Sequence, residues 1–292
     1  MVIVRLMGGL GNQMFQYAFG RCLAKRNDTI LKLDLSFFSS QDINNKNHVF
    51  RNYDLDIFNV QENFASVEEV TRLSKRSKNI FLDKALNKLS GKKKSFILEP
   101  HFHFSSKVYN TSGDIYLHGY WQSEKYFSEV KSLIMSDFTF KEEMTCAAKN
   151  LQIKIKNSNS ICVNVRRGDF ITNSNLGFKG VDYFKQAESI INAEVSDPNY
   201  YIFSDEIEWC EENLKFNAPT FFVSHYYAGK KFQDYLRLMA SCKHYIMPNS
   251  SFAWWAVWFN QDTDKIVIAP KTWFNDQALD TKDLVPAGWI RI

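Results

Sequence analysis

Glycine and proline are scarce in this chain of 292 residues, which contains 12 and 6 of them respectively. Average proteins carry roughly 7% and 5%, so the chain is not collagen-like, linker-like or of low complexity. Hydrophobic residues make up 45% and charged residues 23% of the sequence, and 15% are aromatic. That composition supplies enough apolar surface for a compact core, arranged as one large domain or two smaller ones.

The chain also lacks paired cysteines and long apolar runs. Its five cysteines are dispersed, with no Cys-x-x-Cys pair, which is typical of small buried side chains in a reducing compartment rather than of disulfides or zinc ligands. The longest strongly apolar run, 252–259, is eight residues long, whereas a membrane span needs about 20. The first residues form no signal peptide, because Arg5 interrupts them. We therefore expect a soluble, cytoplasmic protein.

The chain carries little net charge, +4 from 36 basic and 32 acidic residues, which does not by itself indicate a nucleic-acid partner. We expect none. Basic residues are concentrated between Arg72 and Lys94, where nine Lys or Arg stand against the single acid Asp83. This segment is either a solvated surface or a contact with an anionic membrane surface, which such clusters favour.

Three of the twelve glycines, Gly8, Gly9 and Gly11, lie within four residues. They separate an expected strand over 2–7 from an expected helix over 12–26, and a strand over 29–35 completes a βαβ unit. The turn departs from the dinucleotide-binding pattern, because Met14 replaces the third glycine, and no phosphate-loop Gly-Lys-Ser/Thr is present. It is either a tight structural turn or a place where the backbone approaches a ligand closely.

Strands and helices alternate regularly in the second half. We expect strands at 161–165, 200–203, 220–223, 244–247 and 265–269, with helices at 182–195, 205–214, 232–242 and 252–260 between them. This alternation indicates a parallel, doubly wound α/β sheet. A further strand is expected at 114–118, with a helix after residues 119–124. The linker-like residues 157–160 suggest an N-terminal domain over 1–156 and a C-terminal domain over 157–292.

Polar residues follow the expected strands of the second half, where ligands bind in open parallel sheets. Each serine or aspartate alone fits a helix cap. Two adjacent arginines favour a ligand, because guanidinium groups bind phosphate bidentately and helix N-termini add amide donors. The sequence thus predicts a nucleoside-diphosphate site. Its candidate residues are Arg166, Arg167, Asp169, Ser204, Asp205, Ser224, His225, Asn249, Ser250 and Ser251.

A metal site is not expected. Two Asp-x-Asp motifs occur, at 54–56 and 262–264. The first lies in an alternating run and the second in a turn, so both fit structural roles better. The six histidines show no ligand spacing. We predict no metal and no other cofactor.

Five blocks together resemble the bacterial α-1,2-fucosyltransferases of glycosyltransferase family 11. They are GGLGNQMFQYA (8–18), GYWQSEKYF (119–127), VNVRRGD (163–169), FSD (203–205) and NSSFAWW (249–255). The resemblance implies a GT-B fold, with two Rossmann-like, doubly wound domains facing a cleft. It also implies an inverting, metal-independent transfer of L-fucose from GDP-β-L-fucose to the 2-hydroxyl of a β-galactoside, in O-antigen or surface polysaccharide synthesis.

The resemblance also suggests roles for single residues. By similarity to α-1,6- and protein O-fucosyltransferases, Arg166 would hold the β-phosphate, Arg167 and Asp169 would brace its loop, and Asp205 would read guanine. The family usually has histidine where this chain has Asn164. The predicted donor-binding set is Gly9, Gly11, Asn164, Arg166, Arg167, Ser204, Asp205, Ser250 and Ser251. The predicted catalytic set is Arg166, Asn12, Glu124 and Asp169.

The acceptor side leaves more alternatives open. Asn12 would orient the sugar, and Tyr120 and Trp121 are either stacking platforms or core. Glu124, Asp34 and Asp169 are unranked candidates for the general base. A lipid-linked acceptor would turn the segment Arg72–Lys94 toward the inner membrane. The competing functions are a transferase with another nucleotide sugar or fucose linkage, and a carbohydrate-binding protein without activity.

Overall fold

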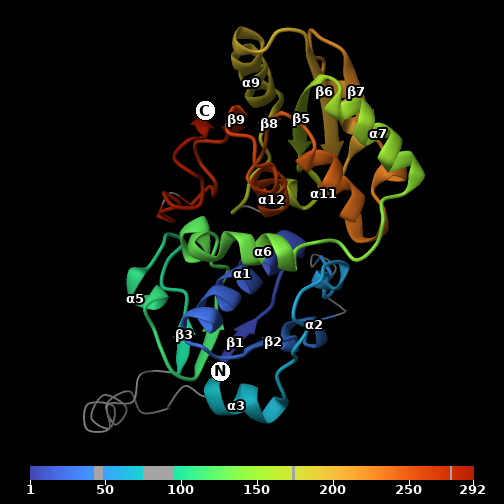
Figure 1. Ribbon diagram of the computed structural model, residues 1–292. Coiled ribbons are helices and arrows are strands. Elements are labelled where there is room, and N and C mark those ends of the chain that lie inside the picture. The colour runs from blue at the N-terminus through green and yellow to red at the C-terminus, as the bar shows by residue number, and fades with distance from the viewer. Residues whose placement is uncertain (43–48, 75–94, 173–174, 277) are drawn as a thin grey trace. The chain divides into compact units, whose positions relative to one another are not determined.

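The computed structural model describes residues 1–42, 49–74, 95–172, 175–276 and 278–292. It divides into two compact units, shown in Figure 1. Unit 1 comprises Met1–Thr139 and Asp280–Leu284, and unit 2 comprises Phe140–Leu279 and Val285–Ile292. The first division falls at 139/140 and not at the expected 156/157. The helix between these points belongs to unit 2 because it buries Leu151 and Ile155 there.

Unit 1 is built on a four-stranded parallel sheet in the order β2-β1-β4-β3. Its strands are β1 (Val2–Arg5), β2 (Leu31–Asp34), β3 (Phe96–Leu98) and β4 (Ile115–His118). Its helices are α1 (Leu10–Arg26), α2 (Ser36–Ser39), α3 (Val67–Ser74), α5 (Ser106–Tyr109) and α6 (Lys131–Asp137), with 3-10 turns η1 (Leu55–Ile57), η2 (Glu124–Tyr126) and η3 (Ser128–Val130). The expected βαβ unit is confirmed. The helix expected after residues 119–124 is replaced by η2 and η3, and α6 follows them.

Unit 2 has a six-stranded parallel sheet in the order β10-β9-β8-β5-β6-β7. Its strands are β5 (Asn159–Val165), β6 (Pro198–Ser204), β7 (Thr220–Val223), β8 (His244–Ile246), β9 (Val267–Ala269) and β10 (Ile290–Arg291). Its helices are α7 (Cys146–Lys156), α8 (Gly168–Thr172), α9 (Val181–Glu194), α10 (Ile207–Asn213), α11 (Gln233–Ala240) and α12 (Ser251–Phe259), with 3-10 turns η4 (His225–Tyr227) and η5 (Lys230–Phe232). The predicted alternation of five strands and four helices is confirmed.

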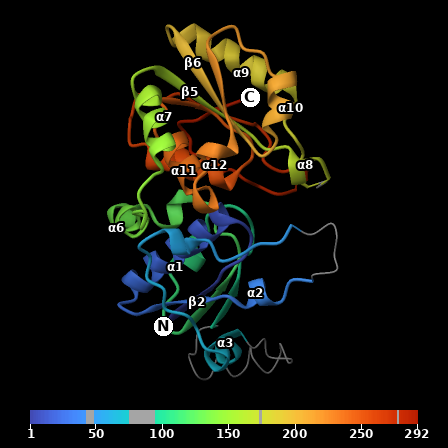
Figure 2. The ribbon, with the colours of Figure 1, turned by 90° about the vertical axis from the view of Figure 1, so that its right-hand side faces the viewer.

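Helices cover both faces of the unit 2 sheet. Val163 of β5 packs with Phe184 of α9 and Cys210 of α10 on one face. Figure 2 shows α7, α11 and α12 on the other side of the sheet. Trp254 and Trp255 of α12 are fully buried, which confirms that this tryptophan-rich helix is a packed element. The sheet is therefore doubly wound, as its sequence pattern predicts.

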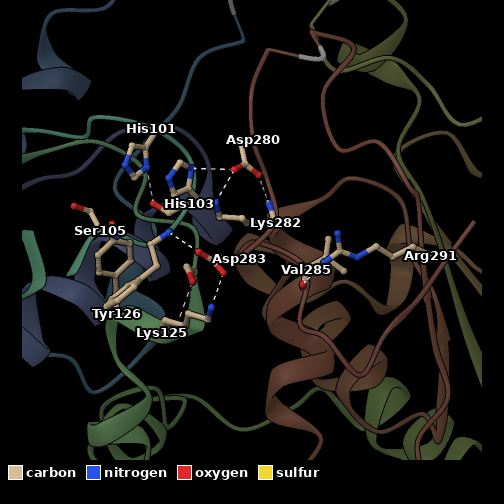
Figure 3. A network of polar contacts seen from close by, with 12 residues as sticks. His101, His103, Ser105, Lys125, Tyr126, Asp280, Lys282, Asp283, Val285 and Arg291 are labelled. Carbon is tan, nitrogen blue, oxygen red and sulfur yellow. Dashed lines mark hydrogen bonds and ion pairs between the residues drawn. The ribbon is translucent and has the colours of Figure 1, made fainter. Parts of the chain in front are cut away.

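A short segment from the C-terminal region completes unit 1. Residues Asp280–Leu284, here called the strap, belong to unit 1 although the chain on both sides belongs to unit 2. Asp283 accepts the backbone N–H of Phe104 at 3.0 Å and pairs with Nζ of Lys125 at 2.5 Å (Figure 3). The chain thus passes between the units three times.

All five cysteines lie within the described residues and are unpaired. Four are buried as expected, but Cys146, at the start of α7, is exposed. Among the described helices, none is long and apolar enough to cross a membrane. Most of the basic segment, 75–94, lies outside the described residues, although Arg72 pairs with Asp114 at 3.3 Å.

Candidate functional site

The predicted donor-side residues meet at one edge of the unit 2 sheet. Strand β5 pairs in parallel with both β6 and β8, so the carboxyl ends of the three strands are neighbours. Arg166 follows β5 directly, Asp205 follows β6, and Ser250 precedes α12 in the loop after β8. This is the edge at which open parallel sheets bind ligands.

Arg166 is held by two carboxylates at this edge. Its Nη2 lies 2.7 Å from Oδ1 of Asp169, and its Nη1 lies 3.1 Å from Oδ2 of Asp205. The guanidinium carbon stands 5.3 Å from the ring centre of Phe170. A guanidinium carries five N–H donors, so the two ion pairs leave others for an anion. The side chain is 28% exposed, which keeps it within reach of a ligand.

Arg167 contacts a different set of groups. Its backbone N–H donates to Oδ1 of Asp205 at 3.0 Å. Its guanidinium pairs with Glu206 and lies 4.9 Å from the ring centre of Trp209. Asp205 therefore joins the loop after β5 to the loop after β6, because one oxygen takes the Arg167 amide while the other takes Arg166.

The charged side chains at this edge include more carboxylates than guanidinium groups, so the edge is not basic. The guanidinium groups of Arg166 and Arg167 face three carboxylates, those of Asp169, Asp205 and Glu206. A phosphate at this edge can bind the guanidinium N–H donors that remain, or it can exchange with a carboxylate on an arginine. The exchange is favourable where the phosphate gives the guanidinium two parallel hydrogen bonds.

Ser204 and Asp205 precede the helix that they were expected to begin. Helix α10 starts at Ile207, two positions beyond Asp205, because the backbone of Glu206 is not helical, with φ −133° and ψ 76°. The Ser204 hydroxyl is buried and accepts the N–H of Glu206 at 2.9 Å. Amide donors of this loop are thus partly used within the loop itself.

The two serines after β8 differ in role. Ser250 is 5% exposed, and its hydroxyl accepts the N–H of Ala253 at 3.4 Å, so it caps α12. Ser251 is the first residue of the helix and is partly exposed. In the other predicted turn, His225 contacts the Ser204 carbonyl through Nε2 at 2.9 Å, and Ser224 precedes η4.

Two buried asparagines at this edge each present an oxygen without a partner in the described structure. Asn164 donates its amide to the Phe203 carbonyl at 3.1 Å, and its Oδ1 accepts nothing. Asn249 donates to the carbonyls of Leu176 and Trp273 at 2.7 and 2.8 Å, and its Oδ1 is likewise unpartnered. Buried acceptors left unpaired are costly, so both indicate that a ligand or water completes this edge.

The glycine-rich turn of unit 1 is shaped by backbone and packing. Gly8 has φ +77°, and a Cβ there would lie 2.5 Å from Nδ2 of Asn12, so only glycine fits. Gly9 is the N-cap of α1, and Gly11 lies buried in its first turn. Asn12 accepts the side-chain amide of Gln122 at 2.7 Å, which joins α1 to the turn after β4.

Two glutamines of α1 are buried and hydrogen-bonded, although they lie outside the apolar face that the sequence predicts for this helix. Gln13 and Gln16 are both fully buried. Gln13 binds the Gly8 carbonyl and the Asn52 carbonyl at 3.0 and 2.8 Å. Gln16 accepts the N–H of Met7 at 2.9 Å and donates to the Gly119 carbonyl at 3.2 Å. These amides tie the glycine-rich turn to its neighbours. In the sequence, the only sign of this role is the spacing of the two polar residues on an otherwise buried helix.

The predicted base candidates occupy very different surroundings. Asp34 is 3% exposed and accepts the hydroxyls of Tyr116 at 2.5 Å and Ser36 at 3.0 Å. Glu124 begins η2 and is partly exposed. Asp169 belongs to the Arg166 ion pair in unit 2.

The structure reveals a carboxylate that sequence reasoning missed, Glu99, directly after β3. It accepts the backbone N–H groups of Tyr120 and Trp121 at 2.6 and 2.9 Å. Trp121 is fully buried against Phe19 and Tyr126, so it is core and not a stacking platform for a sugar. A carboxylate directly after a short apolar run was the available signal, but β3 is only three residues long.

No group of three or more His, Cys, Asp or Glu side chains suited to a metal ion occurs among the described residues. Of the two Asp-x-Asp motifs, Asp54 donates its backbone N–H to Gln13 at 2.9 Å. Asp262 accepts the N–H of Asp264 at 2.9 Å within a turn. The first motif is thus joined to α1 through its backbone, and the second closes a turn.

Comparison with known proteins identifies close relatives. The family model "Glycosyl transferase family 11" matches residues 1–292. The chain is 32% identical over 306 positions to an α-1,2-colitosyltransferase of Escherichia coli, covering 100% of this chain and 98% of that protein. It is 30% identical over 312 positions to the O-antigen biosynthesis glycosyltransferase WbnK of Escherichia coli, covering 98% and 99%.

A solved structure shares the fold. NodZ α-1,6-fucosyltransferase, co-crystallized with GDP, matches with a TM-score of 0.51 at 14% identity, covering 88% of this chain and 91% of that one. The expected α/β class, GT-B-like with parallel sheets, is confirmed by this likeness and by the two sheets.

Proposed function

The chain belongs to glycosyl transferase family 11, and we propose that it transfers L-fucose from GDP-β-L-fucose to the 2-hydroxyl of a terminal β-galactoside, with inversion and without a metal. The observation that carries the proposal is Arg166, a partly exposed guanidinium at the carboxyl edge of the unit 2 sheet. Its donors stabilise the charge that develops on the leaving diphosphate, a contribution of about 3–4 kcal/mol per well-placed donor in enzymes.

Donor binding rearranges the ion pairs described above. The diphosphate takes Arg166 from Asp205. An Asp205 carboxylate released from Arg166 then accepts hydrogen bonds from the guanine base. Ser251 and the first amides of α12 supply further donors to the phosphates, and Asn164 and Asn249 offer unpaired oxygens to the ligand. Arg167 and Asp169 hold the loop in place.

A second donor is supported by a specific observation, the 32% identity to a colitosyltransferase over the whole chain. Colitose lacks the 3-hydroxyl of fucose, so the two donors differ at one position of the sugar ring. A site that hydrogen-bonds the 3-hydroxyl rejects the deoxy sugar strongly. Donor choice therefore depends on whether a polar group of the protein faces that position.

The acceptor that fits best is a lipid-linked O-antigen intermediate, since WbnK carries an O-antigen role in its name. Such an acceptor places the enzyme in the cytoplasm, at the inner membrane surface. Flotation with anionic and neutral vesicles tests this location. Selective binding to anionic vesicles supports it, and equal binding to both contradicts it.

A donor panel tests the proposed reaction. Purified protein is incubated with GDP-fucose, GDP-colitose, GDP-mannose or a UDP-sugar and a set of β-galactosides, and product linkage is read by NMR. We expect an α-1,2-fucosylated product, unchanged activity in EDTA and, for Arg166→Ala, a kcat lowered about 10²–10³-fold. Preference for GDP-colitose would establish the second donor. A strict Mn²⁺ requirement, another linkage, or near-normal turnover by Arg166→Ala would contradict the proposal.

A further inference from the structure

Glu99 is fixed beside the turn that follows β4. Its Oε2 accepts the N–H of Tyr120 at 2.6 Å, and its Oε1 accepts the N–H of Trp121 at 2.9 Å. The approach is so close that a Cβ on Gly119 would lie 2.3 Å from Cβ of Glu99, so only glycine allows it. Each carboxylate oxygen uses one lone pair on these amides and keeps another for a further donor.

The same turn contains a buried acceptor without a partner. Gln122 is 7% exposed and donates its Nε2 to Asn12 at 2.7 Å, but its Oε1 accepts nothing in the described structure. Trp121 is held at φ +57°, a left-handed conformation that is costly for a bulky side chain. Strained backbone is concentrated at functional sites, and a buried acceptor without a partner needs a ligand or a water to complete it.

The electrostatics of Glu99 suit proton transfer near neutral pH. Burial raises the pKa of its carboxyl to about 7, although the two amide donors act in the opposite direction. Among the described residues, the phenols of Tyr120 and Tyr126 are titratable groups that respond to its charge, which adds to the effect of burial in raising their pKa values. Glu99 as a residue is only partly exposed.

We propose that Glu99 is the general base of the transfer reaction and that Oε1 of Gln122 accepts a neighbouring hydroxyl of the acceptor sugar. This assignment rests on the proposed function and refines it. Asp34 already accepts two hydroxyls, and Asp169 is committed to Arg166. Glu99 is bound only by backbone amides in the described contacts, and those amides belong to the turn that holds the unpaired amide oxygen.

The step balances as follows. The acceptor hydroxyl oxygen forms a bond to the anomeric carbon of the donor sugar, while its proton passes to the Glu99 carboxylate. The bond from the anomeric carbon to the β-phosphate oxygen breaks, and its electron pair leaves with GDP. The protonated Glu99 then releases its proton to water, which restores the base.

Kinetics of substituted enzymes test the assignment. We compare Glu99→Gln, Glu99→Asp and Gln122→Leu with the wild type, and with Glu68→Gln on the exposed surface of α3 as a matched control. The wild-type kcat/KM should rise with pH through a midpoint near 7, where Glu99 loses its proton. Glu99→Gln should lower kcat about 100-fold or more and abolish that rise, with the Kd for GDP within about two-fold of normal. Glu99→Asp should keep the rise with reduced kcat.

Gln122→Leu should raise the KM for the acceptor about ten-fold, with a smaller effect on kcat, because it removes roughly one hydrogen bond to the acceptor. Glu68→Gln should match the wild type. If Glu99→Gln keeps the pH-dependent rise, Glu99 only shapes the turn and the assignment is wrong. An unchanged acceptor KM in Gln122→Leu would overturn the role of Gln122.

Acceptor binding separates this inference from the proposed function. Saturation-transfer NMR with a β-galactoside needs no donor and no turnover. If the wild type transfers no sugar from any donor, the proposed function fails, and weaker galactoside binding by Gln122→Leu still supports the acceptor site. Transfer by the wild type together with undiminished binding and turnover in the variants contradicts the acceptor site alone.

Discussion

At the scale of single residues, the site is defined by side chains that are only partly satisfied. Arg166 pairs with two carboxylates yet keeps N–H donors. Asn164 and Gln122 each use the amide nitrogen, and their side-chain oxygens have no partner among the residues that the structure describes. The polar residues that have complete sets of partners, such as Gln16, are those that hold the loops together. We expect a ligand to add contacts at these atoms.

The difference in stability between Glu99→Gln and the wild type should depend on pH, because the Glu99 carboxyl titrates only in the wild type. Its pKa of about 7 in the folded protein lies above the ordinary value near 4.5. The folded state therefore binds more protons, and wild-type stability falls as pH rises from about 4.5 to 7. The glutamine of Glu99→Gln does not titrate. Its free energy of unfolding, relative to that of the wild type, should therefore be higher at pH 8 than at pH 5 by on the order of 1–3 kcal/mol.

Thermal unfolding of both proteins at the two pH values measures this difference. Glu68→Gln serves as the control, because hydrogen bonding to Ser66 holds the pKa of Glu68 below its ordinary value. The difference in stability between Glu68→Gln and the wild type should therefore be the same at pH 5 and pH 8. An equal gap between Glu99→Gln and the wild type at both pH values would show that Glu99 titrates in the ordinary range.

Residue types predict the donor edge better than the acceptor side. Arg166, Asp169 and Asp205 stand in a recognisable order after strands, so their meeting follows from the parallel topology. Nothing local indicates that Glu99 caps a turn about twenty residues further along the chain, or that Trp121 faces the core. Those relations depend on which strands become neighbours.

At the scale of elements, strand bounds were predictable where the strand is long and buried. The expected strand at 220–223 matches β7, and β5 and β6 extend their predictions by a few residues. Strands β3 and β10 were missed because they have three and two residues and include exposed positions. The start of α10 was misplaced because Asp205 binds the Arg167 amide and does not cap the helix.

Gly8→Ala should destabilise the turn between β1 and α1. Alanine at φ +77° is strained, and its Cβ would lie 2.5 Å from Nδ2 of Asn12. We expect the free energy of unfolding to fall by about 1–3 kcal/mol. Gly113→Ala is the matched control, since Gly113 has φ +97° with nothing within 4 Å of a built Cβ.

The control variant isolates the backbone cost from the clash. Thermal unfolding should therefore rank Gly8→Ala below Gly113→Ala, and both below the wild type. Equal stability of the two variants would mean that Asn12 moves aside at no cost, and that the turn is not held by the contact between α1 and Gln122.

At the scale of the whole molecule, the division into units does not follow the order of the chain. Unit 1 takes its last five residues from the strap, 280–284. Two aspartates of the strap contact unit 1: Asp283, which is 12% exposed in its side chain, and Asp280, which lies 3.4 Å from Nδ1 of His103. No shift in composition marks these residues, so the sequence alone predicts only one domain boundary.

Asp283→Asn should weaken the attachment of the strap to unit 1. Burial raises the pKa of Asp283, but Lys125 and the Phe104 amide outweigh it and hold the pKa below its ordinary value. The carboxylate thus contributes stability above about pH 4, and this contribution is lost as pH falls through the folded-state pKa. We expect Asp283→Asn to lower stability by about 1–3 kcal/mol at pH 7.

The loss should shrink in acid, which thermal unfolding at pH 7 and pH 3.5 measures. Asp280→Asn is the control within the strap, because Asp280 is 45% exposed in its pairs with Lys282 and His103. Exposed pairs contribute about 0–1 kcal/mol. An Asp283→Asn variant as stable as Asp280→Asn would show that Lys125 and Phe104 do not hold the strap.

The strap also sets an order of events during synthesis. The ribosome completes residues 1–139 early, but the segment that finishes unit 1 emerges only after nearly all of unit 2. Until then, the N–H of Phe104 and the ammonium of Lys125 lack the carboxylate they bind in the finished protein. A nascent chain stalled or truncated before residue 280 therefore carries an incomplete N-terminal unit, and C-terminal nonsense mutations damage the half of the protein farthest from them in sequence.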